Sequence, residues 1–347
     1  MADENKLMRK LAEGPVICAE GYLFEMEHRG YLQAGAFVPE VVLDHPEVVS
    51  QLHRDFVHAG SDVVLAFTYY AHREKLRLIG REAQLELMNR QALKLAKAVA
   101  AETGTLFAGD ICNTNVYDPN DAKSVAVCRG MFAEQVGWAV DAGVDYIVAE
   151  TFSYGAEAVI AVETAKRSGL PVVATIAVHR APETREGWTP EDCCKRLQDA
   201  GADVVGLNCI RGIDTMMPLV ERIVQAVRVP VAVLPVPYRT NPRTPTFQSL
   251  RDDACDCIPG DRPFPVALDP FTCNRFEVAR FAVRARDAGA RYIGLCCGAM
   301  PHHVRALAEA LGRSPPASRY SADMSKHAFL GTDPTLKAVN REYAKEL

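Results

Sequence analysis

Three cysteines stand where the chain could hold a metal ion. Cys209 closes the apolar run 204–209, and the adjacent pair Cys296 and Cys297 lies near the end of the run 293–298. Each run predicts a buried strand that leads into a helix. Three thiolates collected at strand ends are a ligand set for a zinc ion whose fourth position stays open. The competing interpretation is that these are inert buried thiols, which are common in protein cores.

An all-sulfur ligand set favours one kind of chemistry. Three thiolates already donate much charge to zinc, which suits it poorly to making hydroxide, whereas a fourth sulfur bound there loses its proton. The resulting thiolate is a nucleophile for a methyl carbon on a sulfonium or quaternary ammonium group. Such an onium group is recognised by aromatic faces or carboxylates. Two other interpretations stay open: a zinc hydrolase, which would favour His and Asp ligands, and a structural zinc site, which would need a fourth protein ligand.

A junction that recurs four times indicates how the chain positions these cysteines. Amphipathic segments end at an Ala-Gly pair and an apolar run begins two residues later, at 59–64, 142–147, 200–205 and 288–293. Glycine just past a helix end suits a left-handed cap, and near-continuous apolar runs are typical of strands buried on both faces. Four more apolar runs, at 15–19, 105–110, 172–178 and 229–235, bring the predicted strands to eight.

Helix-like segments alternate with these strands. They cover 46–59, 83–102, 130–142, 156–168, 190–200, 216–227, 275–288 and 301–311. Eight βα units predict an α/β protein with a closed (βα)8 TIM barrel, whose active site forms at the carboxyl ends of the strands. An open doubly wound sheet is the alternative, although no Gly-x-Gly-x-x-Gly follows the first strand. In a barrel, the ends of strands six and eight open onto one mouth.

Two regions depart from the repeat. The proline-rich stretch 235–265 predicts a long loop after strand seven and contains Cys255 and Cys257. Pro315 and Pro316 break the last helix, and a polar arm with a helical-looking end at 334–347 follows. We expect a zinc-binding barrel over 1–312 and an arm over 313–347. An arm without its own core usually lies on another subunit, so we expect a homodimer or homotetramer.

Composition limits the partners. The 347 residues are 48% apolar and carry a formal net charge of −5, which gives no reason to expect nucleic acid or an anionic membrane surface. No apolar run approaches the roughly 20 residues of a membrane span. The first residues are charged and lack the apolar core of a secretory signal. We therefore expect a cytoplasmic protein whose 11 cysteines are reduced.

Motifs along almost the whole chain match one known family. They include Gly30-Tyr31-x-x-Ala34-Gly35, His45-Pro46-Glu47, Phe67-Thr68-Tyr69-Tyr70, Gly206-Leu207-Asn208-Cys209 and Arg291-Tyr292-Ile293-Gly294-x-Cys296-Cys297-Gly298. On these motifs the chain resembles the homocysteine S-methyltransferases, and among them the betaine-dependent ones. The resemblance implies a barrel that binds one Zn²⁺ per subunit through Cys209, Cys296 and Cys297. It also implies methyl transfer from betaine or a similar onium donor to a thiol, homocysteine, giving methionine.

The resemblance assigns substrate residues as well, with departures. Glu150 matches a carboxylate that binds the amino acid substrate, and Tyr70 matches one of the aromatic residues around the donor. Ala19 stands where the family has an aspartate, Phe37 where it has a tryptophan, and Thr151 where it has a tyrosine. These departures weaken a trimethylammonium cage built from aromatic faces, in which each contact contributes about 0.5–2 kcal/mol.

The expected site follows from these assignments. Glu20 is a displaced carboxylate beside Ala19, and Asn208 either orients the substrate or caps the end of strand six. The residues expected to bind substrate are Glu150, Glu20, Tyr70, Phe37, Thr151 and Asn208. No general base is assigned, because the metal removes the thiol proton. S-methylmethionine, a dimethylsulfonio compound or another methylated amine as donor, a different thiol as acceptor, and a non-catalytic zinc-binding protein are the alternatives.

Overall fold

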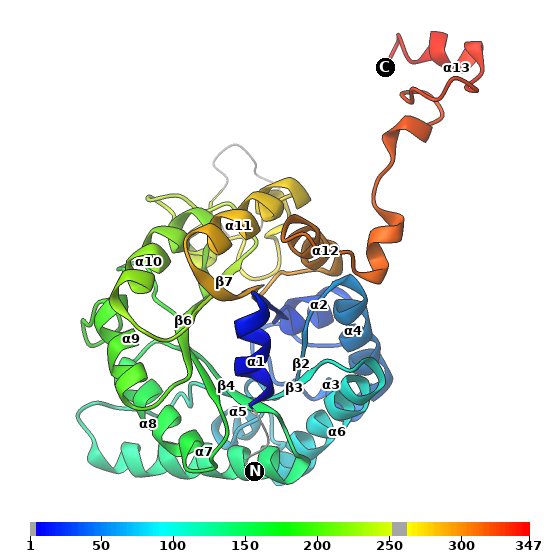
Figure 1. The fold of residues 1–347 in the computed structure, drawn as a ribbon. Coiled ribbons are helices and arrows are strands. Elements are labelled where there is room, and N and C mark those ends of the chain that lie inside the picture. The colour runs from blue at the N-terminus through cyan, green and yellow to red at the C-terminus, as the bar shows by residue number, and fades with distance from the viewer. Residues whose placement is uncertain (1–4, 252–261) are drawn as a thin grey trace.

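Eight parallel strands form one sheet that curves into a nearly closed barrel (Figure 1) in the computed structural model, which describes residues 5–251 and 262–347. The strands are β1 (Val16–Ala19), β2 (Val63–Leu65), β3 (Leu106–Cys112), β4 (Tyr146–Phe152), β5 (Val172–Ile176), β6 (Val204–Gly212), β7 (Val231–Val236) and β8 (Ala290–Leu295). Their order around the sheet is β1-β8-β7-β6-β5-β4-β3-β2. The predicted α/β barrel is therefore confirmed, whereas Cys255 and Cys257 lie outside the described residues.

Polar contacts join β1 to β2 where the described residues show no strand pairing. The Ile17 N–H donates to Asp62 Oδ2 at 2.8 Å, and the Asp62 N–H donates to the Ile17 carbonyl at 2.8 Å. The Arg313 guanidinium contacts both the Asp62 carboxylate and the Pro15 carbonyl. The seam of the barrel thus closes through a backbone hydrogen bond and side-chain contacts at Asp62 in place of a full ladder.

The alternating helices surround the sheet as predicted. They are α4 (Pro46–Ala59), α6 (Leu85–Thr103), α7 (Ala122–Ala142), α8 (Gly155–Lys166), α9 (Pro190–Asp199), α10 (Ile213–Ala226), α11 (Arg275–Asp287) and α12 (Pro301–Ala310). The predicted start of α7 at Gly130 is wrong. Asp121 caps the helix earlier by accepting from the Lys123 N–H, and the exposed Val127 obscures the apolar periodicity of its first turns.

Four short helices have no counterpart in the predicted repeat. They are α1 (Lys6–Glu13), α2 (Tyr22–His28), α3 (Val41–Asp44) and α5 (Arg73–Leu78). Figure 1 shows α1 crossing one opening of the barrel, where its Leu7 and Leu11 are buried. Lys6 and Lys10 pair with Asp145 and Asp62, which precede β4 and β2. Because α1 covers the amino-terminal ends of the strands, the carboxyl ends form the accessible mouth.

Large side chains fill the interior between α1 and the mouth. Tyr146 of β4 and Tyr292 of β8 are fully buried, and their hydroxyl oxygens lie 3.0 Å apart across the barrel. The two rings form a packed layer rather than a channel, as is usual for eight-stranded parallel barrels.

Beyond α12 the chain leaves the barrel as an extended arm (Figure 1). The arm contains the short 3₁₀ turns Pro316–Tyr320 and Met324–Lys326 and the helix α13 (Ala338–Tyr343). The helix predicted over 334–347 is thus confined to six residues. Large apolar side chains along the arm are exposed: Tyr320, Met324, Leu330, Val339, Tyr343 and Leu347. Within residues 5–251 and 262–347, no helix combines the length and apolar character that a bilayer crossing requires.

Glycines let β6 and β8, the strands that position the three predicted cysteines, lie close to their neighbours. A Cβ added at Gly206 would lie 2.0 Å from the Ala232 carbonyl oxygen, and one at Gly294 would lie 1.9 Å from the Cys18 carbonyl oxygen. We expect Gly206→Ala and Gly294→Ala each to lower the free energy of unfolding by about 1–3 kcal/mol or more, because backbone must move apart. Urea denaturation measures the change.

The same substitution at Gly130 of α7 is the control, since a Cβ there meets no atom within 4 Å. Gly130→Ala should be neutral or stabilising by about 0.5–1 kcal/mol. Identical unfolding midpoints for Gly206→Ala and the wild type would contradict the close-approach argument.

Candidate metal centre and substrate cavity

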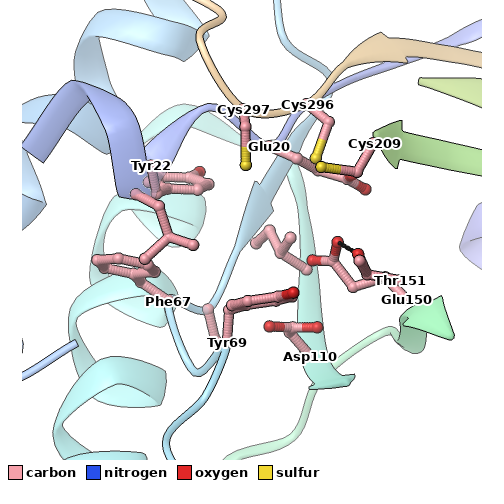
Figure 2. Close-up of a pocket in the computed structure, with 13 residues that line it drawn as sticks. Glu20, Tyr22, Phe67, Tyr69, Asp110, Glu150, Thr151, Cys209, Cys296 and Cys297 are labelled. Atoms are coloured by element: carbon pink, nitrogen blue, oxygen red, sulfur yellow. Dashed lines mark hydrogen bonds between the residues drawn. The ribbon is translucent and has the colours of Figure 1, made fainter. Parts of the chain in front are cut away.

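The three predicted cysteines meet in space. The Sγ atoms of Cys209, Cys296 and Cys297 all lie within 4.8 Å of one another, and all three residues are buried. Cys209 belongs to β6, while Cys296 and Cys297 directly follow β8. Figure 2 shows their sulfur atoms gathered on one side of a cavity. The prediction that strand ends six and eight build one group at one mouth is confirmed.

Unusual backbone conformations aim side chains into this mouth. Cys209 and Ile210 have φ angles of 56° and 62°, and the pairing of β6 with β7 shifts register between Asn208 and Gly212. Thr151, at the end of β4, has a φ of 62°. Residues other than glycine rarely adopt this left-handed region, and such strained positions concentrate at functional sites. The irregularity bends β6 so that the Cys209 sulfur faces the pair after β8.

The sulfur cluster is arranged to carry negative charge. Hydrogen bonds from the Cys296 and Cys297 thiols hold the pKa of Cys209 well below its ordinary value of 9.0. The pKa of Cys296 is raised by burial, and that of Cys297 is raised by its contact with Cys209. One thiolate is therefore supported by two thiols, and a cation is needed to deprotonate all three. Three buried sulfur donors with one side open to a cavity fit a tetrahedral metal site with a free position.

A cavity lies next to the sulfur cluster. Besides the three cysteines, its wall contains the carboxylates Glu20, Asp110 and Glu150, the rings of Tyr22, Phe67 and Tyr69, and the smaller or aliphatic residues Leu23, Leu65, Ala66 and Thr151. No basic side chain lines it among the described residues. The cavity thus joins a soft metal site to a strongly acidic and partly aromatic wall (Figure 2).

Asn208 lies behind the wall and fixes its carboxylate. The Asn208 Nδ2 donates to Glu150 Oε2 at 2.7 Å and to Thr151 Oγ1 at 2.8 Å. In turn, the Thr151 N–H donates to Asn208 Oδ1 at 3.0 Å, and its hydroxyl donates to Glu150 Oε2 at 2.8 Å. A side chain held by this many bonds has one orientation, so Asn208 is a positioning residue for Glu150.

The acidic wall is costly to ionise. Burial raises the pKa of Glu150 to about 7, and burial followed by the charge of Glu150 raises the pKa of Glu20 and of Asp110 well above their ordinary values. Desolvated like charges destabilise one another's ionised forms. Both effects favour a positively charged occupant, which would return these carboxyls to the charged state.

The predicted substrate residues divide into three groups. Glu20, Glu150 and Thr151 line the cavity, and Asn208 supports it. Tyr70 and Phe37 do not line this cavity. The Lys75 Nζ lies 4.0 Å from the centroid of the Tyr70 ring, and Phe37 stacks on Phe24 with ring centroids 5.8 Å apart. The roles assigned to Tyr70 and Phe37 at the donor stay predictions.

Four acidic or aromatic lining residues were not predicted from the sequence: Asp110, Tyr22, Phe67 and Tyr69. Asp110 carried a usable signal, because it is the only charged residue in the otherwise apolar strand 106–112 and buried charges are rare without a partner. Tyr69 stands next to Tyr70, and the choice between two neighbouring tyrosines depends on backbone geometry that residue type does not reveal.

Fold and site together define a βα barrel with a buried group of three cysteines at its mouth that fits a metal ion. The family model for homocysteine S-methyltransferase matches residues 21–311. Betaine–homocysteine S-methyltransferase 1 of Xenopus tropicalis is 35% identical over 360 residues, covering 98% of this chain and 85% of that protein. The S-methylmethionine–homocysteine S-methyltransferase BHMT2 of Pongo abelii is 33% identical, covering 98% of this chain and 92% of that protein.

A solved structure agrees on the fold. The metallated form of the homocysteine methyltransferase MmuM from Escherichia coli superposes with a TM-score of 0.67 at 20% identity, covering 87% of this chain and 98% of that chain. With the match of the family model and of the full-length relatives, the chain belongs to the homocysteine S-methyltransferase family and is a methyltransferase of that family.

The raised pKa of Glu150 predicts a pH dependence of stability in the metal-free protein. In the folded state this pKa is about 7, against an ordinary value of 4.5, so the folded state keeps a proton that the unfolded state releases. Stability is therefore lost as the pH rises from about 4.5 to 7. Glu150→Gln removes this loss, which is on the order of 3 kcal/mol at about 1.4 kcal/mol per pKa unit.

The measurement is urea unfolding of both proteins, freed of metal, between pH 5 and pH 8 (roughly the range in which Glu150 titrates). Glu47→Gln, whose parent side chain is 71% exposed, is the matched control and should leave the slope unchanged. Parallel pH profiles for Glu150→Gln and the wild type would show that Glu150 is not the titrating group.

Proposed function

We propose that this protein is a zinc-dependent S-methyltransferase that moves a methyl group from an onium donor to the sulfur of homocysteine, giving methionine. The observation that carries this proposal is the buried group of Cys209, Cys296 and Cys297 facing a cavity with three carboxylates and no basic lining residue among those described. A zinc ion held by these cysteines would keep the sulfur of the acceptor deprotonated at neutral pH.

The side chains of the cavity would place the two reactants. Glu150, held by Asn208 and Thr151, binds the ammonium group of the acceptor, and Glu20 lies on the sulfur side, where its N–H donates to the Leu295 carbonyl at 3.0 Å. The acceptor sulfur attacks the methyl carbon in line, and the electron pair of the breaking bond stays on the nitrogen or sulfur of the donor. No proton moves in this step, so positioning supplies most of the rate.

The donor is an onium compound, and two kinds have comparable support. Relatives named for betaine and for S-methylmethionine are similar to the chain to nearly the same degree, 35% and 33%. The rings of Tyr22, Phe67 and Tyr69 give methyl groups of an onium centre aromatic faces to contact. Thr151 occupies little of the wall, and we propose that the space it leaves selects the donor, with Tyr70 and Phe37 nearer the outside.

Zinc content and activity test the proposal together. We expect about one zinc per purified chain, and we expect Cys297→Ala to lose most of it. Methyl transfer should fall by more than about 100-fold, beyond the 10- to 100-fold typical of residues that only support a ligand. Cys194→Ala, at a buried cysteine of α9 remote from the cluster, is the control for thiol loss. Protein without zinc, or full activity in Cys297→Ala, would refute the proposed chemistry.

Methionine formation from homocysteine with betaine, S-methylmethionine and dimethylsulfoniopropionate in parallel then identifies the donor. In cobalt-substituted protein, an absorption change on adding homocysteine separates this function from a merely structural metal site, whose four positions would already be filled.

We propose further that the arm over 313–347 joins subunits into a homodimer or homotetramer. Its exposed apolar side chains, among them Val339 and Tyr343, have no barrel surface to cover. Truncation after Ser321 removes most of them and keeps the Arg313 contacts with Asp62 and Pro15. Light scattering should give the truncated protein the mass of a smaller assembly, or the truncated protein should precipitate. A soluble truncation with the wild-type assembly mass would refute this role.

A further inference from the structure

Two carboxylate oxygens of the cavity have no hydrogen-bond donor among the described residues. They are Glu20 Oε1 and Asp110 Oδ1, and their residues are only 7% and 4% exposed. By contrast, Glu150 Oε2 receives hydrogen bonds from both Asn208 and Thr151. An acceptor buried without a donor is unfavourable, and such an atom in a native site needs an explanation. Because both residues line the cavity, the missing donors belong to whatever occupies it.

Asp110 is the less expected of the two. It lies in the middle of β3, where its backbone carbonyl accepts from the Thr68 hydroxyl at 2.7 Å, so its strand position is fixed. Its carboxyl contacts that of Glu150. Figure 2 shows Asp110 beneath Tyr69, on the side of the cavity opposite the three sulfur atoms. A substrate whose sulfur lies at the cysteines therefore reaches Asp110 with its other end.

The chemistry of the unpartnered oxygens discriminates between a primary ammonium group and an onium centre. A quaternary ammonium or a sulfonium carries charge but no N–H, so it cannot donate a hydrogen bond. A primary ammonium group offers three N–H donors. Hydrogen bonds from an ammonium to carboxylates are also about twice as strong as neutral ones. The Asp110 end of the cavity thus suits the amine of the thiol acceptor and not the onium centre of the donor.

A carboxylate group of a substrate, in contrast to an ammonium group, is unsuited to this cavity. No lysine, arginine or histidine lines the cavity in the described part of the chain, and three carboxylates already face it. A fourth carboxylate inside would meet repulsion and no charged partner. The carboxylate of an amino acid acceptor would therefore point out of the cavity and contribute little to binding.

Resting on the proposed methyl transfer to a thiol, we infer that Asp110, together with the neighbouring Glu150, determines acceptor specificity by binding a primary ammonium group, so that the site selects aminothiols and does not require their carboxylate. Homocysteine and its analogue without the carboxylate, 3-aminopropane-1-thiol, should both bind. The analogue without the amine, 4-sulfanylbutanoate, should bind poorly.

The test measures the affinity of the zinc-loaded, full-length protein for these three thiols by calorimetry, and methyl transfer to each. In the wild type, 3-aminopropane-1-thiol should bind at least about 10-fold more tightly than 4-sulfanylbutanoate. Asp110→Asn should lower this preference by about 10-fold or more. Asp141→Asn, at an α7 side chain that is 60% exposed and pairs with Arg90, is the matched control and should leave the preference unchanged.

The outcomes separate the possible failures. If Asp110→Asn lowers the affinity for all three thiols equally, Asp110 only supports the structure, and the inference is overturned. Weaker binding of the onium donor alone in this variant would also overturn it, by placing the donor at Asp110. If Asp110→Asn does not fold, Asp110→Ser, which also removes the carboxylate, carries the same prediction. Wild-type protein that binds none of the thiols would instead contradict the proposed function itself.

Discussion

Burial of negative charge without internal compensation governs this structure. Three sulfur atoms and three carboxylates face one cavity at the mouth of the barrel, and no described lining residue is cationic. Such a site is unfavourable when empty, because ionised groups removed from water need partners. The raised pKa values of Glu20 and Asp110 and the lowered pKa of Cys209 show how the groups share protons in response. The site is therefore suited to cations brought from outside.

The barrel tolerates this cost because its framework is otherwise conventional. The strands are apolar and continuous, and the buried tyrosines of β4 and β8 fill the interior below the cavity. Within the described strands, non-glycine residues with positive φ lie towards the carboxyl ends, as at Cys209 and Thr151, where this backbone directs side chains into the mouth. Stability is supplied at one end of the strands and chemistry at the other, the division of roles that parallel barrels commonly show.

Sequence patterns predicted the framework and the meeting of the three cysteines well, because both rest on local signals. Apolar runs, Ala-Gly junctions and cysteines at strand ends are visible in the chain itself. The cavity wall was harder to predict. Whether Asp110 lines the cavity depends on which face of β3 turns inward. Whether Tyr69 lines it depends on the path of the chain after β2. Asn208 was expected to orient the substrate or cap its strand, but its contact with Glu150 joins residues 58 positions apart, which no local pattern encodes.

The contact of Arg313 with Asp62 and Pro15 ties the first residue of the arm to the seam between β1 and β2. The boundary that the sequence suggests at 312–313 is therefore not a neutral place to cut or graft. A chimera that exchanges arms between related barrels at this point would also replace Arg313, whose contacts hold β1 and β2 together. The barrel and the first residues of the arm should therefore come from the same protein. A junction placed beyond the 3₁₀ turn Pro316–Tyr320 keeps these contacts intact.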